Sequence, residues 1–202
     1  MSRTTGLLLA AGRGRRAGGP KALRTHPDGT TWVRRAVQTL RDGGCTDVHV
    51  VVGAAAQDVR EALADEDVRV VRAADWARGM GASLRAGLAA LGDRPADVAC
   101  VHLVDLPDVG ADVVRRLLQE ADGVDTLVRA TYGSRPGHPV LIGRSHWPAV
   151  AGAAHDDTGA RDYLAQSAVR LVDCSDLAGG ADVDGPAGLP SASPTTTEVP
   201  GA

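Results

Sequence analysis

Phenylalanine is missing from this sequence, and aromatic residues make up only 2% of its 202 residues. A core without many large rings has to be built from the abundant Val, Leu and Ala residues. The length is that of one ordinary domain with a sizeable core rather than of two domains. This composition by itself indicates no function.

Cysteine is also scarce: the sequence has three, Cys45, Cys100 and Cys174. Their odd number, their wide spacing and the lack of a CxxC pattern or nearby histidines argue against a disulfide framework or a zinc site. We therefore expect reduced thiols.

The sequence has no long hydrophobic run and no strong net charge. Its first apolar stretch, residues 6–11, is too short for a membrane-spanning helix or the core of a signal peptide, so we expect a soluble, cytoplasmic protein. With 22 basic and 25 acidic side chains the formal charge is -3, which gives no bulk attraction for nucleic acid or an anionic membrane. Any anion binding must be local, and we expect a monomer or a weak oligomer.

Segments with the apolar pattern of strands alternate along the chain with segments that have the apolar spacing of helices. β-Branched and apolar runs typical of strands occupy residues 7–10, 47–53, 68–73, 97–105 and 125–132. Between them, apolar residues recur at three- and four-residue spacing, which predicts helices over residues 31–44, 56–66, 81–93 and 112–122. This alternation predicts a doubly wound α/β fold, a mostly parallel sheet with helices on both faces. Ligands of such sheets bind beyond the carboxyl ends of the strands.

The alternation weakens after Tyr132. Residues 135–143 indicate a turn into a short strand, residues 158–167 a helix and residues 168–174 a last strand. The stretch from 185 to 202 is rich in Pro, Gly, Ser and Thr, so we expect one domain over residues 1–184 and a disordered tail over 185–202.

A glycine-rich loop with four cations, Arg13, Arg15, Arg16 and Lys21, follows the first apolar run. Freed backbone N–H groups, guanidinium forks and a lysine point charge are typical of a loop that cradles phosphates. A plain surface turn with solvated arginines is the alternative.

Two familiar phosphate loops do not explain this stretch. A dinucleotide-binding GxGxxA turn opens a helix and needs an acidic residue about 20 residues further on, whereas Gly18, Gly19 and Pro20 follow here and residues 50–56 carry no carboxylate. A Walker A loop fails because Pro20 precedes Lys21 and Ala22 stands where a Ser or Thr must bind magnesium.

Residues 7–23, LLLAAGRGRRAGGPKAL, resemble the signature L-A-[AG]-G-x-S-x-R-M-G-x-x-K of the MobA-like nucleotidyltransferases. Gly14 replaces the usual serine and Ala17 the usual methionine. Further motifs follow in the family's order at residues 75–88, 102–109, 135–150, 155–164 and 182–189, so the resemblance covers residues 6–189. The set is most similar to the molybdenum cofactor cytidylyltransferase branch.

The resemblance implies a Rossmann-like nucleotidyltransferase fold and transfer of CMP from CTP to the phosphate of molybdopterin or the molybdenum cofactor. Pyrophosphate is released, and Mg²⁺ is the implied cofactor. Family members with Leu-Ala-Ala-Gly tend to use CTP and those with Leu-Ala-Gly-Gly tend to use GTP, so Ala11 favours CTP.

The resemblance also implies a nucleotide site. Arg16 and Lys21 are expected to hold the triphosphate, with Lys21 meeting the charge that develops at the α-phosphate. Ser83 is expected either to donate to the nucleotide or to cap a helix. Arg13 and Arg15 are equally explained as solvated neighbours. The expected contacts to the base and ribose are Leu9, Ala10, Ala11, Gly12, Arg13, Gly79 and Met80.

Asp105 follows the apolar run 98–104, which places its carboxylate at the carboxyl end of a central strand. Carboxylate oxygens suit Mg²⁺, which takes one or two of them together with phosphate and water; a turn cap before Pro107 is the alternative. Asp184 in DVDGP resembles the family's late D-x-D-T-P segment and is implied as a second metal ligand. Gly185 and Gly188 replace the usual residues there, so Asp182 or Asp184 is alternatively a turn former.

The resemblance places the acceptor at His138, Asp157 and Arg161. His138 would pair with the acceptor's phosphate or pterin, and a structural histidine is the alternative. For Asp157 the alternative is the cap of a helix.

Three function hypotheses follow. The first is the magnesium-dependent cytidylyltransferase, and the second keeps the fold but uses GTP or another phosphorylated acceptor. The third is a nucleotide-binding maturation factor that transfers nothing and has a molybdenum enzyme as its partner. The altered DVDGP segment favours the third, whereas Lys21 and Asp105 oppose it.

Overall fold

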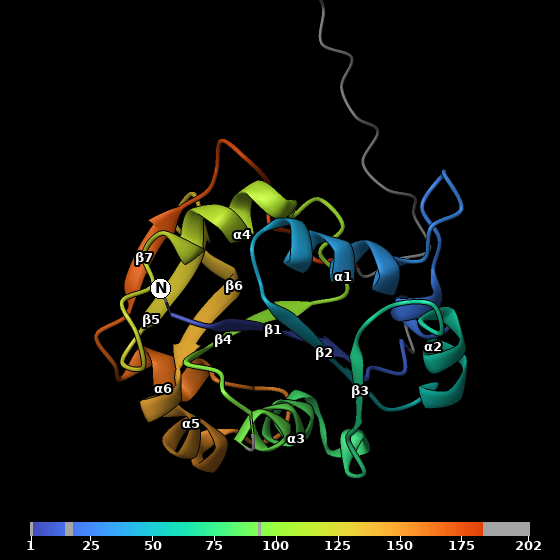
Figure 1. Cartoon of the computed structure of the whole chain (residues 1–202), viewed down its shortest axis with the longest axis horizontal. Helices are drawn as coiled ribbons and strands as arrows, with labels where there is room; N and C mark the ends of the chain where they lie inside the picture. The colour runs from blue at the N-terminus through green and yellow to red at the C-terminus, as the bar shows by residue number, and fades with distance from the viewer. Residues whose placement is uncertain (1, 15–17, 93, 184–202) are drawn as a thin grey trace, which may run out of the picture.

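The structure is a computed structural model and describes residues 2–14, 18–92 and 94–183. In these residues seven strands form one sheet in the order β3-β2-β1-β4-β6-β5-β7 (Figure 1). The strands are β1 (Thr4–Ala10), β2 (Asp47–Val52), β3 (Arg69–Arg72), β4 (Val98–Leu103), β5 (Leu127–Tyr132), β6 (Arg135–Gly143) and β7 (Arg170–Asp173).

Parallel pairing dominates the centre of the sheet. β1 lies between β2 and β4 and is parallel to both, with Leu8 beside Val50 and His102. β6 runs antiparallel to its two neighbours, β4 and β5, and β7 is parallel to β5. The predicted fold class is confirmed: the sheet is mostly parallel and has helices on both faces.

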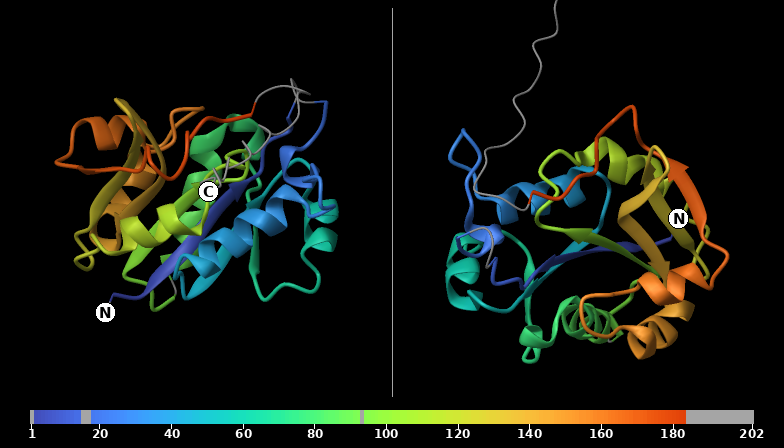
Figure 2. Two further views of the ribbon diagram at one scale, coloured as in Figure 1. Left: turned by 90° about the horizontal axis from the view of Figure 1, so that it is seen from above. Right: turned by 180° about the vertical axis from the view of Figure 1, so that it is seen from behind.

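Helices cover the two faces as separate layers (Figures 1 and 2). On one face lie α1 (Trp32–Asp42) and α4 (Ala111–Leu118), and α2 (Ala56–Ala62) adds Val59 to their apolar cluster. The other face carries α3 (Met80–Gly92), α5 (Trp147–Ala153) and α6 (Arg161–Ala165). Because side chains alternate along a strand, Leu8 packs into the first cluster and Leu7 into the second.

The structure corrects several predicted elements. The expected short strand over 135–143 is the nine-residue strand β6. α5 was not predicted, because seven residues of Trp, Pro, Val, Ala and Gly are too few to show a helical period. A single 3-10 turn, η2 (Lys21–Leu23), directly follows Pro20, where the glycines and the proline argued against a helix.

Two further 3-10 turns are η3 (Trp76–Arg78) and η4 (Arg144–His146). The expected disordered tail over 185–202 lies outside the described residues. Within the residues that are described, no helix is both long and apolar enough to cross a membrane.

Candidate functional site

The carboxyl ends of β1 and β4 carry the residues predicted to bind a nucleotide. Ala10 and Ala11 are buried, and the chain becomes exposed at Gly12. The carbonyl of Leu9 accepts a hydrogen bond from the N–H of Val104 at 3.3 Å, and that of Ala11 accepts one from Ala54 at 3.1 Å. These bonds fix the start of the loop against both neighbouring strands.

The loop after β1 closes on itself through glycine. The N–H of Gly19 donates to the carbonyl of Gly14 at 3.2 Å. Gly14 has φ of 61°, and a Cβ there would lie 1.9 Å from the carbonyl oxygen of Gly19. Since an L side chain is strained at this φ and would overlap the backbone, a serine does not fit this loop conformation. This conformation of the loop therefore requires glycine at position 14.

Lys21 and Asp105 meet at the mouth of this loop. The Lys21 Nζ atom lies 2.9 Å from Asp105 Oδ2, and the two side chains are 15% and 22% exposed. Lys21 begins η2, and Asp105 follows β4 after one intervening residue, Val104. A cation and a carboxylate thus lie together at the carboxyl edge of the sheet, where parallel sheets bind ligands.

The segment that follows β7 returns across the same edge, and Asp108 anchors it. Asp108 Oδ2 accepts the N–H groups of Gly179 at 2.8 Å and Gly180 at 3.0 Å. The N–H of Val183 then donates to the backbone carbonyl of Asp105 at 3.1 Å. Sequence reasoning missed the role of Asp108, although it lies within the family-like stretch 102–109.

Arg13 packs on an aromatic side chain. Its guanidinium lies 4.9 Å from the centre of the Trp76 ring, a cation–π contact. Gly53 lets that ring approach the loop, because a Cβ at this position would lie 2.6 Å from both the Ala11 carbonyl oxygen and the Trp76 ring. Arg13 therefore contacts η3 while it remains exposed, and its role towards a nucleotide stays a prediction.

The start of α3 contacts the loop that precedes α6. Gly79 has φ of 104°, and a Cβ there would lie 2.5 Å from the Asp156 carbonyl. The N–H of Met80 donates to Asp157 Oδ1 at 3.3 Å, and the N–H of Gly81 donates to the carbonyl of Asp156 at 2.8 Å. A predicted nucleotide segment and a predicted acceptor residue are thus in direct contact.

Neither of the helix caps that were the alternatives to a functional role of Asp157 and Ser83 is found at the expected place. Asp157 receives the first N–H of α3, whereas the residue that caps α6 is Ala160. Ser83 lies inside the first turn of α3, which begins at Met80, and the residue is 4% exposed. Its burial gives no support to a hydrogen bond from its hydroxyl to a nucleotide.

His138 lies near the carboxyl end of β4, because β6 is antiparallel to that strand. Burial, aided by the nearby His102 and Arg129, lowers the pKa of His138 to about 3. Its ring is therefore neutral at neutral pH. The expected pairing of His138 with the phosphate or pterin of an acceptor stays a prediction, because a bound phosphate would raise this pKa. The backbone carbonyl of His138 accepts the Tyr132 hydroxyl at 2.7 Å.

Arg161 is exposed at the first turn of α6 and lies close enough to Arg129 to affect it. Burial, with a smaller contribution from Arg161, lowers the pKa of Arg129. Arg129 Nε donates to the Gly137 carbonyl at 3.0 Å. Arg129, which sequence reasoning missed, thus lies near both Arg161 and His138.

Two predicted site residues, Arg16 and Asp184, lie outside the described residues. Among the residues that are described, no group of three or more His, Cys, Asp and Glu side chains is arranged to hold a metal. Mg²⁺ keeps several waters and uses one or two carboxylates with substrate phosphates, so a single carboxylate such as that of Asp105 would be enough to hold it. The Asp105 side chain is 22% exposed, and the backbone carbonyl of Asp105 accepts the N–H of Val183.

An open α/β sheet with a glycine loop, a lysine and a carboxylate at its carboxyl edge is typical of a nucleotide-binding protein. The chain matches the MobA-like NTP transferase domain over residues 6–171. It belongs to this family and has the family's nucleotidyltransferase fold.

Individual relatives differ in their activities. Nicotine blue oxidoreductase of Paenarthrobacter nicotinovorans is 42% identical over 190 residues, which cover 89% of this chain and 91% of that protein. A nucleotidyl transferase from Methanothermobacter thermautotroptrophicus has a TM-score of 0.76 at 26% identity and covers 91% of this chain and 92% of its own.

The Rv0371c protein of Mycobacterium tuberculosis H37Rv also has a TM-score of 0.76, at 30% identity, and the match covers 91% of this chain and 93% of that one. A structure of the same mycobacterial protein in complex with manganese has a TM-score of 0.68 at 28% identity, with coverage of 85% and 88%.

Proposed function

We propose that this protein is a magnesium-dependent nucleotidyltransferase that moves CMP from CTP to the phosphate of molybdopterin or its molybdenum complex. An oxygen of the acceptor phosphate forms a bond to the α-phosphorus of CTP, the bond from that phosphorus to the bridging oxygen breaks, and pyrophosphate leaves. The observation that carries this proposal is the pair of Lys21 and Asp105, 2.9 Å apart beside the glycine loop at the carboxyl edge of the sheet.

The acceptor needs little help from a base. A phosphate monoester has its second pKa at about 6, so it is largely dianionic at neutral pH. The protein's contribution is then positioning and neutralisation of charge. Lys21 would meet the α-phosphate and Arg16 the rest of the triphosphate, while Arg13, held on Trp76, adds charge at the rim of the loop.

Backbone groups would recognise the base and ribose. Gly12 is the first exposed residue after β1, and Leu9, Ala10 and Ala11 lead up to it. In this proposal Gly79 and Met80 contact the base or ribose from the other side, and the bond from the Met80 N–H to Asp157 holds them in place. Ala11 favours CTP over GTP, on the family tendency alone.

Asp105 and Asp184 would hold the Mg²⁺ ion, which when bound neutralises phosphate charge and orients the triphosphate. The manganese complex of the mycobacterial relative supports a divalent cation in this family. On the acceptor side, Arg161 and Arg129 would supply cationic charge for the acceptor's phosphate, and His138 would donate a hydrogen bond as a neutral ring.

A second function is favoured by one observation. The oxidoreductase from Paenarthrobacter nicotinovorans is 42% identical to this chain and is matched over 91% of its length. Reduction of nicotine blue or a similar compound within the same fold is therefore the competing proposal. A nucleotide-binding maturation factor for a molybdenum enzyme is the third, and the altered DVDGP segment favours it.

Pyrophosphate release separates these proposals. Purified protein is incubated with Mg²⁺ and molybdopterin and with CTP, GTP, ATP or UTP in turn, and a parallel reaction contains nicotine blue with a reduced nicotinamide dinucleotide. Release of pyrophosphate with CTP supports the cytidylyltransferase. Release with GTP and with no other NTP supports a transferase of the same fold that uses GTP. Bleaching of the dye without any pyrophosphate release supports the oxidoreductase. If neither pyrophosphate release nor bleaching is observed, the result supports the maturation factor.

A further inference from the structure

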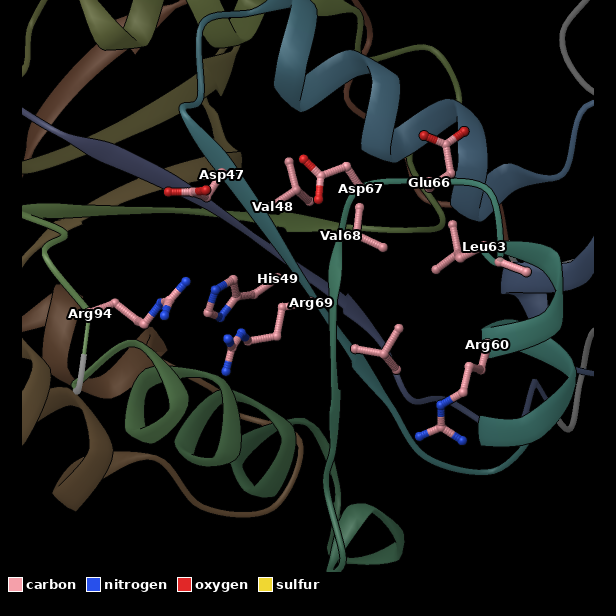
Figure 3. A pocket seen from close by; sticks show the side chains of 12 residues that line it. Asp47, Val48, His49, Arg60, Leu63, Glu66, Asp67, Val68, Arg69 and Arg94 are labelled. Carbon is pink, nitrogen blue, oxygen red and sulfur yellow. The ribbon is translucent and has the colours of Figure 1, made fainter.

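A cavity of about 570 Å³ opens at the amino-terminal ends of β2 and β3, on the edge of the sheet opposite the Lys21 loop (Figure 3). Volumes of this size are typical of small-molecule sites. None of the residues predicted for the nucleotide or acceptor site lines it. One end of the cavity is basic and is formed by His49 of β2, Arg69 of β3 and Arg94, which follows α3.

His49 is the buried member of this cluster. It is 3% exposed, and its Nδ1 atom is enclosed without a hydrogen-bond partner among the described residues. The strand register places Arg69 directly beside it. In Figure 3 the imidazole lies between the guanidinium groups of Arg69 and Arg94.

Arg69 and Arg94 are exposed and lack the acidic partners that Arg34 and Arg41 have. Arg34 is paired with Asp65 at 2.7 Å and Arg41 with Glu66 at 2.6 Å. In the part of the chain that is described, the side chains of Arg69 and Arg94 form neither an ion pair nor a hydrogen bond. Three carboxylates also line the cavity. Glu66 is paired with Arg41 and Arg34, and among the described residues neither Asp47 nor Asp67 forms an ion pair with Arg69 or Arg94.

We propose that this cavity binds the phosphate group of a small phosphorylated molecule, with Arg69 and Arg94 as its cationic ligands and His49 as a hydrogen-bonding partner. Guanidinium groups match phosphate oxygens because their N–H donors point in parallel from a planar fork. The remainder of the molecule lies against the apolar wall of Leu63, Val68 and Val70. This site is separate from the proposed nucleotide crevice and does not depend on the proposed activity.

The charges around His49 give the site a spectroscopic signature. Burial and the charges of Arg69 and Arg94 lower the pKa of His49, and only Asp47 acts in the opposite direction. A bound phosphate dianion adds negative charge beside the ring and therefore raises its pKa. Phosphate binding is thus coupled to proton uptake at His49.

The test is a titration of the full-length protein with inorganic phosphate at constant ionic strength, with chloride as the reference anion. The His49 ring resonances are followed by NMR over a pH series. We expect a saturable shift and a higher His49 pKa in phosphate, both retained in Lys21→Ala. Ribose 5-phosphate is the second probe: tighter binding than phosphate identifies a phosphorylated metabolite, and equal binding identifies free phosphate as the ligand.

Arg69→Gln and Arg94→Gln are each expected to weaken phosphate binding at least about tenfold, the effect of losing one charged hydrogen-bonding group. Arg72→Gln is the matched control, because Arg72 is an exposed arginine of the same strand that does not line the cavity. Absence of a saturable response at His49, or wild-type binding in both Arg69→Gln and Arg94→Gln, overturns the proposal. Loss of the response in Lys21→Ala also overturns it, since the phosphate then binds at the nucleotide loop.

Discussion

Replacement of Asp105 by Asn is expected to change CTP affinity in opposite directions with and without Mg²⁺. In the free protein the Asp105 carboxylate is 2.9 Å from the Lys21 ammonium. A triphosphate that binds without metal must compete with this carboxylate for Lys21 and is also repelled by it. With Mg²⁺ present, the same carboxylate is a proposed metal ligand, and its loss weakens the nucleotide complex.

The magnitude follows from the burial of the pair. Exposed ion pairs contribute about 0.2–1 kcal/mol, and breaking a fully buried pair costs about 3–5 kcal/mol. Side chains that are 15% and 22% exposed lie between these limits. An intermediate value of about 1.5 kcal/mol corresponds to a roughly tenfold gain in metal-free CTP affinity for Asp105→Asn.

Isothermal titration calorimetry of wild-type protein and Asp105→Asn with CTP, in EDTA and in Mg²⁺, measures both effects. Asp112→Asn is the control, because Asp112 is an exposed carboxylate on α4 that pairs with Arg115. A change of the same sign in both buffers would falsify the assignment of Asp105 to the metal.

Three further predictions concern single substitutions. Lys21→Ala should slow nucleotidyl transfer at least about 100-fold with an unchanged circular dichroism spectrum, because it removes one electrostatic stabiliser of the transition state; a near-normal rate contradicts the proposed role. Gly79→Ala should lower the free energy of unfolding in urea by about 1–3 kcal/mol, since φ is 104° and the new Cβ would lie 2.5 Å from Asp156; wild-type stability would show that the contact is not formed. Burial lowers the pKa of His102 from 6.5 to about 4. The unfolded chain therefore binds a proton at this histidine at a higher pH than the folded protein does. As a result, the contribution of His102 to the free energy of unfolding is present above pH 6.5 and is lost as the pH falls towards 4. Wild-type protein loses free energy of unfolding between pH 7 and pH 5, and this decrease should be smaller by about 2 kcal/mol in His102→Leu. An equal decrease in both proteins contradicts the shifted pKa.

Much of the fold was predictable from local patterns. The β-branched runs and the intervening helical periods predicted the central strands and the helices α1 to α4, because burial on both faces of a sheet leaves a continuous apolar run. β6 and α5 were harder. The length of β6 and its antiparallel direction depend on pairing with β4 and β5, and α5 is too short for a periodic signal.

The site was predictable where it depends on strand ends. Lys21 and Asp105 each follow an apolar run, so both were expected at the carboxyl edge of the sheet, although their direct pairing was not. The contact of Asp157 with Met80 joins residues 77 positions apart, and the bonds of Asp108 to Gly179 and Gly180 span a similar separation. No local pattern reports such contacts. The functional roles of these residues stay predictions.

The most direct test of the central claim is pyrophosphate release from CTP by the purified protein with Mg²⁺ and molybdopterin, compared with the same mixture without molybdopterin. We expect release that requires both the acceptor and the metal and that is strongly reduced in Lys21→Ala. No release of pyrophosphate from CTP or any other NTP under these conditions would contradict it.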